Sequence, residues 1–154
     1  MPMTSMGNTV EGRILGVGVD LVHVPSFAEQ LELPESRFRG LFTPGERADI
    51  QDRSAHYGAH DGDSAHDGAR HWAVRWAAKE AVIKAWSASI FGEEPVLGDE
   101  AFGQIETVTD TWGRPRIALH GDVARELAAY SVDVSLSHDG DHAIAYVVLS
   151  APTS

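Results

Sequence analysis

The 154-residue sequence contains no cysteine, and this absence excludes several kinds of site. Without cysteine there is no disulfide framework, no thiolate metal site and no cysteine nucleophile. Long apolar runs are also missing, since no stretch comes near the ~18 residues that suggest a membrane span. We therefore expect a cytoplasmic protein that does not need a membrane.

Positive charge is scarce as well, because 12 Lys and Arg stand against 23 Asp and Glu, for a formal net charge of −11. Most of such a surface repels a phosphate backbone, so we do not expect nucleic-acid binding. One segment departs from this balance. Residues 70–84 contain four bases and a single acid, namely Arg70, Arg75, Lys79, Lys84 and Glu80. We expect an anionic ligand to bind there.

The length of the chain fits a single domain with one core. Residues 1–12 lack the cationic start and apolar region of a secretory signal, and we interpret them as a disordered leader. The domain is expected to span residues 13–150. Within it, residues 56–68 are rich in Gly, Ala, Asp and His without hydrophobic periodicity, which predicts a mobile loop. The His and Asp residues of this loop resemble a metal cluster in composition only, because their spacing does not fit a calcium loop.

The hydrophobic pattern predicts an α+β domain. Strands are expected at residues 13–20, 104–109, 116–120, 132–137 and 142–149. Helices are expected at residues 25–33, from Pro44 onward, at 69–87 and at 122–130. Because strands and helices mostly segregate along the chain, we expect an antiparallel sheet packed on the long helix 69–87.

Two local patterns refine the helices. Thr43, Pro44 and Glu46 fit the N-cap, first helical residue and N3 position of a capping box. In the long helix, Trp72, Trp76 and Trp86 recur at nearly helical spacing. Aromatic faces of long helices usually pack inward, so this stripe is expected in the core rather than at a cofactor.

Asp20 is the first candidate for chemistry. It ends an apolar strand, where its carboxylate can face a cleft, and Gly16 and Gly18 allow another backbone to approach closely. The alternative is an ordinary acid of a turn or helix cap. The residues around Asp20 do not decide between these interpretations.

Glu80 is the second candidate. Helix geometry places Trp76, Glu80 and Lys84 on one face, with Arg75 and Lys79 in the neighbouring row. Magnesium favours one or two protein carboxylates together with substrate phosphates and waters, and the bases would neutralise those phosphates. Alternatively, Glu80 and Lys84 form an ordinary surface pair at i,i+4.

His138 lies in a Ser-His-Asp run at residues 137–139. Consecutive strand residues point to opposite faces, so this run cannot form a catalytic triad. His138 alone could bind a phosphate when protonated, or it could be a structural histidine.

Five sequence motifs in order resemble the bacterial holo-acyl-carrier-protein synthases of the phosphopantetheinyl transferase family, over about residues 13–150. The most specific is the Trp-Ala-Ala-Lys-Glu-Ala run within residues 75–85. The others are weaker alone, and they are Gly16-Val-Gly-Val-Asp20, Phe42-Thr-Pro-Gly-Glu46, Gly113-Arg-Pro115 and Ser135-Leu-Ser-His138.

The resemblance implies a phosphopantetheinyl transferase-like fold and a set of site residues. Asp20 and Glu80 would hold Mg²⁺, and the pyrophosphate of coenzyme A would complete its coordination. Lys84 and Arg75 would neutralise phosphates of coenzyme A. The remaining nucleotide-site residues would be Gly113, Pro115 and His138. Family members of this size form trimers with active sites between subunits, so a homotrimer is expected.

The implied reaction moves phosphopantetheine from coenzyme A to a serine of an apo acyl carrier protein, releasing adenosine 3′,5′-bisphosphate, in support of fatty acid biosynthesis. Catalysis would rest on Glu80 and Lys84, and the serine proton would go to Glu80 or to a metal-bound water. Two alternatives use the same residues. One is a metal-dependent nucleotide phosphohydrolase, and the other is a non-catalytic module that binds coenzyme A or the carrier.

The sequence departs from the family pattern in places. Ser87 stands where a glycine is common, and residues 56–68 resemble an insertion. The helix after Asp20 is acidic, through Glu29, Glu32 and Glu35, although an acidic carrier protein would favour bases there. Carrier docking would then depend less on charge or use other bases, namely Arg37, Arg39, Arg47 and Arg53.

Overall fold

The computed structural model describes residues 12–57 and 64–152. In chain order its elements are β1 (Gly12–His23), α1 (Val24–Glu32), η1 (Phe38–Leu41), α2 (Pro44–Tyr57), α3 (Ser64–Ser89), η2 (Asp99–Gln104), β2 (Ile105–Thr109), β3 (Pro115–Leu119), α4 (Gly121–Glu126), β4 (Ser131–Asp139) and β5 (His142–Pro152). The leader assigned to the first residues lies almost entirely outside the described part of the chain.

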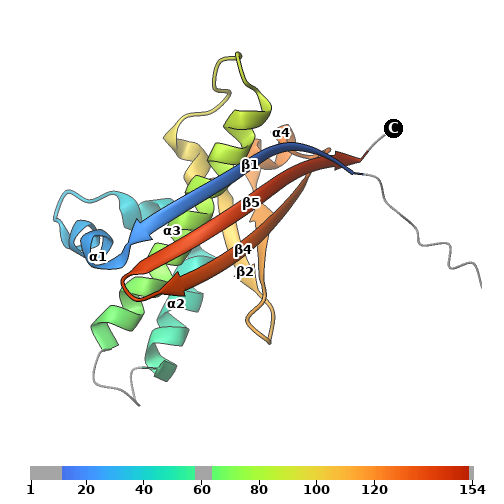
Figure 1. The fold of residues 1–154 in the computed structure, drawn as a ribbon. Helices are drawn as coiled ribbons and strands as arrows, with labels where there is room; N and C mark the ends of the chain where they lie inside the picture. Colours follow the sequence, from blue (N-terminus) through green and yellow to red (C-terminus); the bar gives the residue numbers. More distant parts are fainter. Residues whose placement is uncertain (1–11, 58–63, 153–154) are drawn as a thin grey trace, which may run out of the picture.

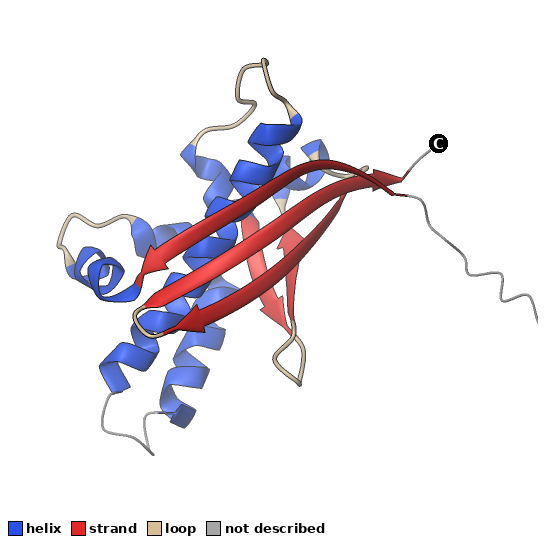
Figure 2. Cartoon of the chain, in the orientation of Figure 1, coloured by secondary structure: helices blue, strands red, loops and turns tan. Residues whose placement is uncertain are grey.

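Two antiparallel sheets accompany one long helix. The larger sheet has the order β1-β5-β4, and β2 pairs with β3 as a separate hairpin. Figures 1 and 2 show the three long strands crossing one side of α3, which contacts β1 and β5 extensively. The predicted α+β class, with an antiparallel sheet on a long helix, is confirmed.

Glycines in β1 explain how closely the sheet and α3 approach. A Cβ added to Gly18 would overlap the carbonyl oxygen of Ala81, and one added to Gly16 would overlap that of Ala85. Both alanines are completely or almost completely buried. The expectation that these glycines admit a neighbouring backbone is confirmed. Because side chains alternate along a strand, Asp20 faces the same side of β1 as the two glycines.

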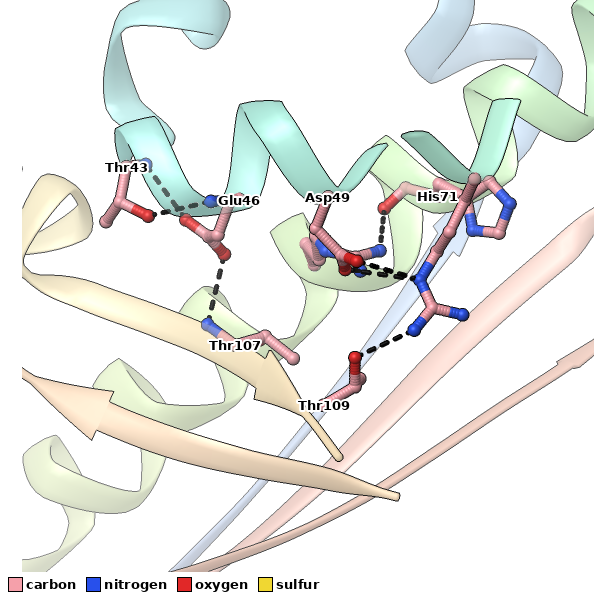
Figure 3. Close-up of polar contacts among 8 residues, drawn as sticks. Thr43, Glu46, Asp49, His71, Thr107 and Thr109 are labelled. Atoms are coloured by element: carbon pink, nitrogen blue, oxygen red, sulfur yellow. Dashed lines mark hydrogen bonds and ion pairs between the residues drawn. The ribbon is translucent and has the colours of Figure 1, made fainter. Parts of the chain in front are cut away.

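The N-terminus of α2 joins three elements through one carboxylate. Glu46 Oε1 accepts a hydrogen bond from Thr43 N (3.0 Å), and Thr43 Oγ1 accepts one from Glu46 N (3.1 Å). The predicted capping box is therefore confirmed. Glu46 Oε2 also accepts from Thr107 N of β2 (3.2 Å), and Glu46 pairs with Lys79 of α3 at 2.7 Å. Figure 3 shows the contacts of Glu46 with Thr43 and Thr107.

The tryptophans of α3 pack as predicted. The Trp76 ring lies 4.9 Å from both Phe38 and Phe102, measured between centroids, and Trp72 makes an edge contact with Phe42. Trp86 is buried. The aromatic stripe therefore belongs to the core, where it joins α3 to the helical segments η1 and η2.

The structure corrects some expected boundaries. The long helix begins at Ser64 rather than at residue 69, and α2 continues to Tyr57, so helix replaces loop at both ends of the stretch 56–68. Alanines at 65 and 69 favour helix, and a turn added to an existing helix needs no new nucleation. Residues 58–63 lie outside the described ranges. No helix in those ranges is long and apolar enough to cross a bilayer.

Candidate functional site

The end of β1 brings a carboxylate and an ammonium together. Lys84 Nζ lies 3.0 Å from Asp20 Oδ1, and it also donates to the carbonyl oxygen of Val19 at 3.0 Å. Lys84 keeps about half of its side chain exposed (52%), whereas the Asp20 side chain is mostly covered. The pair therefore lies at the surface with its cation accessible to an anionic ligand.

Glu80 belongs to the same cluster. Partial burial raises the pKa of its carboxyl, the negative charge of Asp20 raises it further, and Lys84 opposes the shift. Within the described residues no ion pair joins Glu80 to Lys84, whose partner is Asp20. The alternative of an ordinary i,i+4 surface pair is therefore not the arrangement seen here. Asp20, Glu80 and Lys84 form what we call the carboxylate cluster.

The carboxylate cluster fits the donor preferences of a magnesium ion. Both carboxylates are partly buried, and the charge of Asp20 adds to burial in raising the pKa of Glu80, so a divalent cation nearby would stabilise both. No group of three or more His, Asp and Glu in the described ranges could hold a metal. Magnesium does not need such a group, because it commonly takes one or two carboxylates plus phosphate oxygens and waters.

A separate pocket of about 170 Å³ opens between α2, α3, the β2–β3 hairpin and β4. Its lining includes all four remaining candidates for the nucleotide site, namely Arg75, Gly113, Pro115 and His138. We call it the nucleotide pocket. It adjoins α3 near Arg75, about 14 Å along the helix axis from Lys84 at 1.5 Å per residue. Nine residues make about two and a half turns, so the pocket and Lys84 lie on opposite sides of α3.

The hairpin turn that contributes Gly113 and Pro115 has a fixed shape. Asp110 Oδ1 accepts hydrogen bonds from the backbone N of Trp112 and of Arg114, both at 2.9 Å. These contacts hold the pKa of Asp110 below its usual range, the backbone N–H of Arg114 contributing most. Gly113 has a φ of +81°, a conformation that glycine adopts without steric cost. The turn thus presents Pro115 to the pocket in one conformation.

Arg75 lines the pocket from a buried position. Its side chain is only 4% exposed, and it pairs with Asp49 of α2 while Nη1 donates to the carbonyl oxygen of His71 (3.1 Å). Burial lowers the pKa of Arg75, and Asp49 opposes that shift. Arg75 is therefore a cation held by protein partners, unlike the exposed Lys84.

Lys79 does not take the role that its place in the helix suggested. We expected it to neutralise ligand phosphates, but it is completely buried and pairs with Glu46 at 2.7 Å. It also donates to the carbonyl oxygens of Phe102 (2.8 Å) and Ile105. The expectation was wrong because the capping carboxylate of α2 faces this side of α3. Lys79 joins α3 to α2 and β2.

Sequence reasoning missed Arg53 as a residue of the pocket and Asp49 as its ion-pair partner. Arg53 was grouped with bases for carrier docking, yet it lines the nucleotide pocket and donates to Thr109 Oγ1 of β2 (2.8 Å). Asp49 was not singled out at all. Their i,i+4 spacing on α2 was the available signal, since such a pair can form an ion pair.

Comparisons with known proteins show the family of this chain. The sequence matches the 4′-phosphopantetheinyl transferase superfamily over residues 16–147. A holo-[acyl-carrier-protein] synthase of Mycobacterium ulcerans is 51% identical over 136 residues, which cover 88% of this chain and 96% of that protein. The structure of Mycobacterium tuberculosis acyl carrier protein synthase shares 46% identity with a TM-score of 0.71, covering 91% of this chain and 100% of that one.

A structure that contains a ligand is also similar. The ACPS–CoA complex of Chronobacterium ammoniagenes has 43% identity to this chain and a TM-score of 0.77, and the match covers 90% of this chain and 98% of that one. These comparisons confirm the resemblance found in the sequence motifs and the fold that it implied. The chain belongs to the 4′-phosphopantetheinyl transferase superfamily.

Proposed function

We propose that this protein is an enzyme that transfers the phosphopantetheine arm of coenzyme A to a serine hydroxyl of an apo acyl carrier protein. The reaction releases adenosine 3′,5′-bisphosphate and yields the holo carrier protein that fatty acid biosynthesis uses. The observation that carries the proposal is that one helix, α3, contributes residues to both the carboxylate cluster and the nucleotide pocket. Relatives named holo-[acyl-carrier-protein] synthase and a similar ACPS–CoA complex support it.

Asp20 and Glu80 would hold Mg²⁺ in this reaction. When bound, the ion would neutralise negative charge on the phosphoryl oxygens. Both residues offer carboxylate oxygens, and burial together with the charge of Asp20 raises the pKa of Glu80, a shift that a bound cation would oppose.

Lys84 and the pocket residues bind the anionic parts of coenzyme A. The exposed ammonium of Lys84 stabilises charge on the transferred phosphoryl group. Arg75 and His138 contact the nucleotide part from the pocket, where Gly113 and Pro115 shape one wall. Since phosphoryl transfer depends mainly on positioning and charge stabilisation, these groups supply the larger part of catalysis.

The serine oxygen forms a bond to the phosphorus next to pantetheine, and the bond from that phosphorus to the nucleotide phosphate breaks. The serine proton needs an acceptor. It would go to Glu80 or to a water bound by the metal, because a carboxylate that already binds a cation is a weaker base.

The exposed face of β1 supports the expected homotrimer. Residues on the side away from α3 are apolar and exposed, namely Val17, Val19, Leu21, Ile144 and Tyr146 of β1 and β5. A contiguous apolar face of this kind marks an interaction surface. Other copies of the chain would cover it, with active sites between subunits as in the family. Light scattering after size exclusion measures the assembly directly.

We further propose that residues 13–150 form one domain that works in the cytoplasm. The main core cluster includes residues from Val22 in β1 to Leu149 in β5, which supports one folding unit.

The negative charge of helix α1 is partly compensated, since Arg39 pairs with Glu32 at 2.7 Å. Because α1 contains no Lys or Arg, carrier docking would use bases of neighbouring segments or depend less on charge.

Intact-mass spectrometry tests the proposal. Apo acyl carrier protein is incubated with this protein, coenzyme A and magnesium, and a chelator is added to a parallel sample. We expect the carrier mass to rise by one phosphopantetheine, and the gain to disappear with chelator. Breakdown of coenzyme A without carrier modification would indicate a phosphohydrolase instead, and binding of coenzyme A without any reaction would indicate a binding module.

A further inference from the structure

Asp49 connects two arginines that come from different helices. It lies one turn before Arg53 on α2, and Arg53 Nε donates to both of its oxygens, at 3.1 Å to Oδ1 and 3.2 Å to Oδ2. The second oxygen also accepts from Nη2 of Arg75 on α3. Figure 3 shows the Asp49 carboxylate in the middle of these contacts. One carboxylate therefore orients two guanidinium groups.

The arrangement continues to the β2–β3 hairpin. Nη2 of Arg53 donates to Thr109 Oγ1 at 2.8 Å, so Arg53 is fixed at one end by Asp49 and at the other by β2. Arg53, Arg75 and Thr109 all line the nucleotide pocket. The contacts thus hold two cations at the wall of a cavity, rather than at the open surface.

The pocket retains polar groups that need a partner. Nε of Arg75 and Oγ1 of Thr107 are both buried, and neither has a hydrogen-bond partner among the described residues. Both residues line the pocket and are 3% exposed. Buried polar groups without partners are costly, so the protein itself leaves hydrogen-bonding capacity unused at this wall. Phosphate oxygens are suitable acceptors for arginine.

We propose that Asp49 is a positioning residue that holds Arg53 and Arg75 in the orientation that binds a phosphate group of coenzyme A. This inference rests on the proposed function and extends it to two residues that the motifs did not indicate. Asp49 does not touch the ligand in this proposal. It acts through the two guanidinium groups, whose planar donors bind phosphate only when correctly oriented.

The direction in which one substitution changes the affinity for an anion distinguishes a positioning role from a purely electrostatic role. Asp49→Asn removes a negative charge beside the pocket, so a purely electrostatic role would tighten the binding of an anion. A positioning role predicts weaker binding. We expect the Kd for adenosine 3′,5′-bisphosphate, measured by titration calorimetry, to rise about tenfold, the loss typical of a charge-assisted contact.

Kinetics provide a second readout. In Asp49→Asn the KM for coenzyme A should rise by a factor similar to the Kd, with kcat and the KM for the carrier nearly unchanged. Asp49→Glu keeps the charge and should restore part of the affinity. Glu93→Gln removes one charge from an exposed residue outside the pocket and serves as the matched control.

A second variant covers the case in which Asp49→Asn does not fold, since Arg75 is buried. Thr109→Val removes the hydroxyl that accepts from Arg53 and leaves both ion pairs, while Thr109→Ser keeps the hydroxyl. Weaker binding of the bisphosphate by the valine variant alone supports the inference. Unchanged or tighter binding by folded Asp49→Asn, or by Thr109→Val if the first variant is unfolded, overturns it. The proposed function fails separately, if the wild-type protein neither binds coenzyme A nor modifies the carrier.

Discussion

The close approach of β1 to α3 predicts the effect of adding one methyl group. In Gly18→Ala, the new Cβ would overlap the carbonyl oxygen of Ala81 and lie 2.7 Å from the backbone N of Ala85, and real Cβ atoms essentially never come within 3.0 Å of other atoms. Both obstacles are helix backbone, so β1 or α3 must shift. Overpacking costs about 1–3 kcal/mol, and a rigid obstacle places this substitution near 3 kcal/mol.

Urea unfolding followed by tryptophan fluorescence measures this cost, at one protein concentration in case the protein assembles. A loss of ~3 kcal/mol corresponds to a decrease in Tm of about 6–12 °C for a domain of this size. Gly12→Ala is the matched control on the same strand, because its Cβ would lie 3.7 Å from the nearest atom, the carbonyl oxygen of Ala151. It should change stability by less than about 0.5 kcal/mol.

Activity should fall with stability in the same variant. Asp20 lies two residues beyond Gly18 on the same face of β1, so a shift of the strand moves its carboxylate relative to Lys84. A misplacement near 1 Å can cost roughly 10²-fold in rate. If Gly18→Ala unfolds at the wild-type urea concentration with the same slope and transfers at the wild-type rate, the reasoning from close approach is refuted.

Three further predictions concern charged residues. Lys84→Ala should reduce kcat/KM for coenzyme A by about 10- to 100-fold, the loss of one charge-assisted phosphate contact, and unchanged steady-state kinetics would contradict its role. Glu80→Gln should abolish transfer but stabilise the metal-free protein at pH 7. Because the pKa of Glu80 is raised in the folded protein, the metal-free wild type loses stability as pH rises above 4.5 and through that pKa. The gain in Tm of Glu80→Gln over wild type, measured in chelator, should therefore be absent below pH 4.5. Lys79→Met should cost about 3–5 kcal/mol by leaving Glu46 buried without its ion-pair partner, whereas the double variant with Glu46→Gln should cost clearly less in the same unfolding assay.

Local sequence rules predicted those parts of the fold that depend on neighbours in the chain. Thr43 and Glu46 are three residues apart, so their reciprocal hydrogen bonds follow from helix geometry alone. The tryptophans of α3 follow from helical periodicity in the same way. Gly16 and Gly18 were correctly expected to admit a backbone, since a residue without Cβ in an apolar strand has few other uses.

Contacts between distant segments could not be predicted in this way. Lys79 and Glu80 are adjacent and both charged, yet one is completely buried and the other borders the surface. The difference arises because α2 places Glu46 beside Lys79. The sequence of α3 alone does not reveal the position of Glu46. Likewise, Asp49 and Arg53 were visible as an i,i+4 pair, but the third partner, Arg75, comes from another helix.

The strand order β1-β5-β4 has a consequence for the time at which the protein can fold. β5 is the central strand, and it pairs with β1 along its whole length, from Gly12 opposite Pro152 to His23 opposite His142. These partners are more than a hundred residues apart in sequence, so a nascent chain must keep β1 unpaired until β5 has been synthesised. During that interval the apolar face of β1 and its free edge resemble an aggregation-prone segment. Slow translation, or loss of β5, would therefore lead to aggregation of the chain before any effect on catalysis.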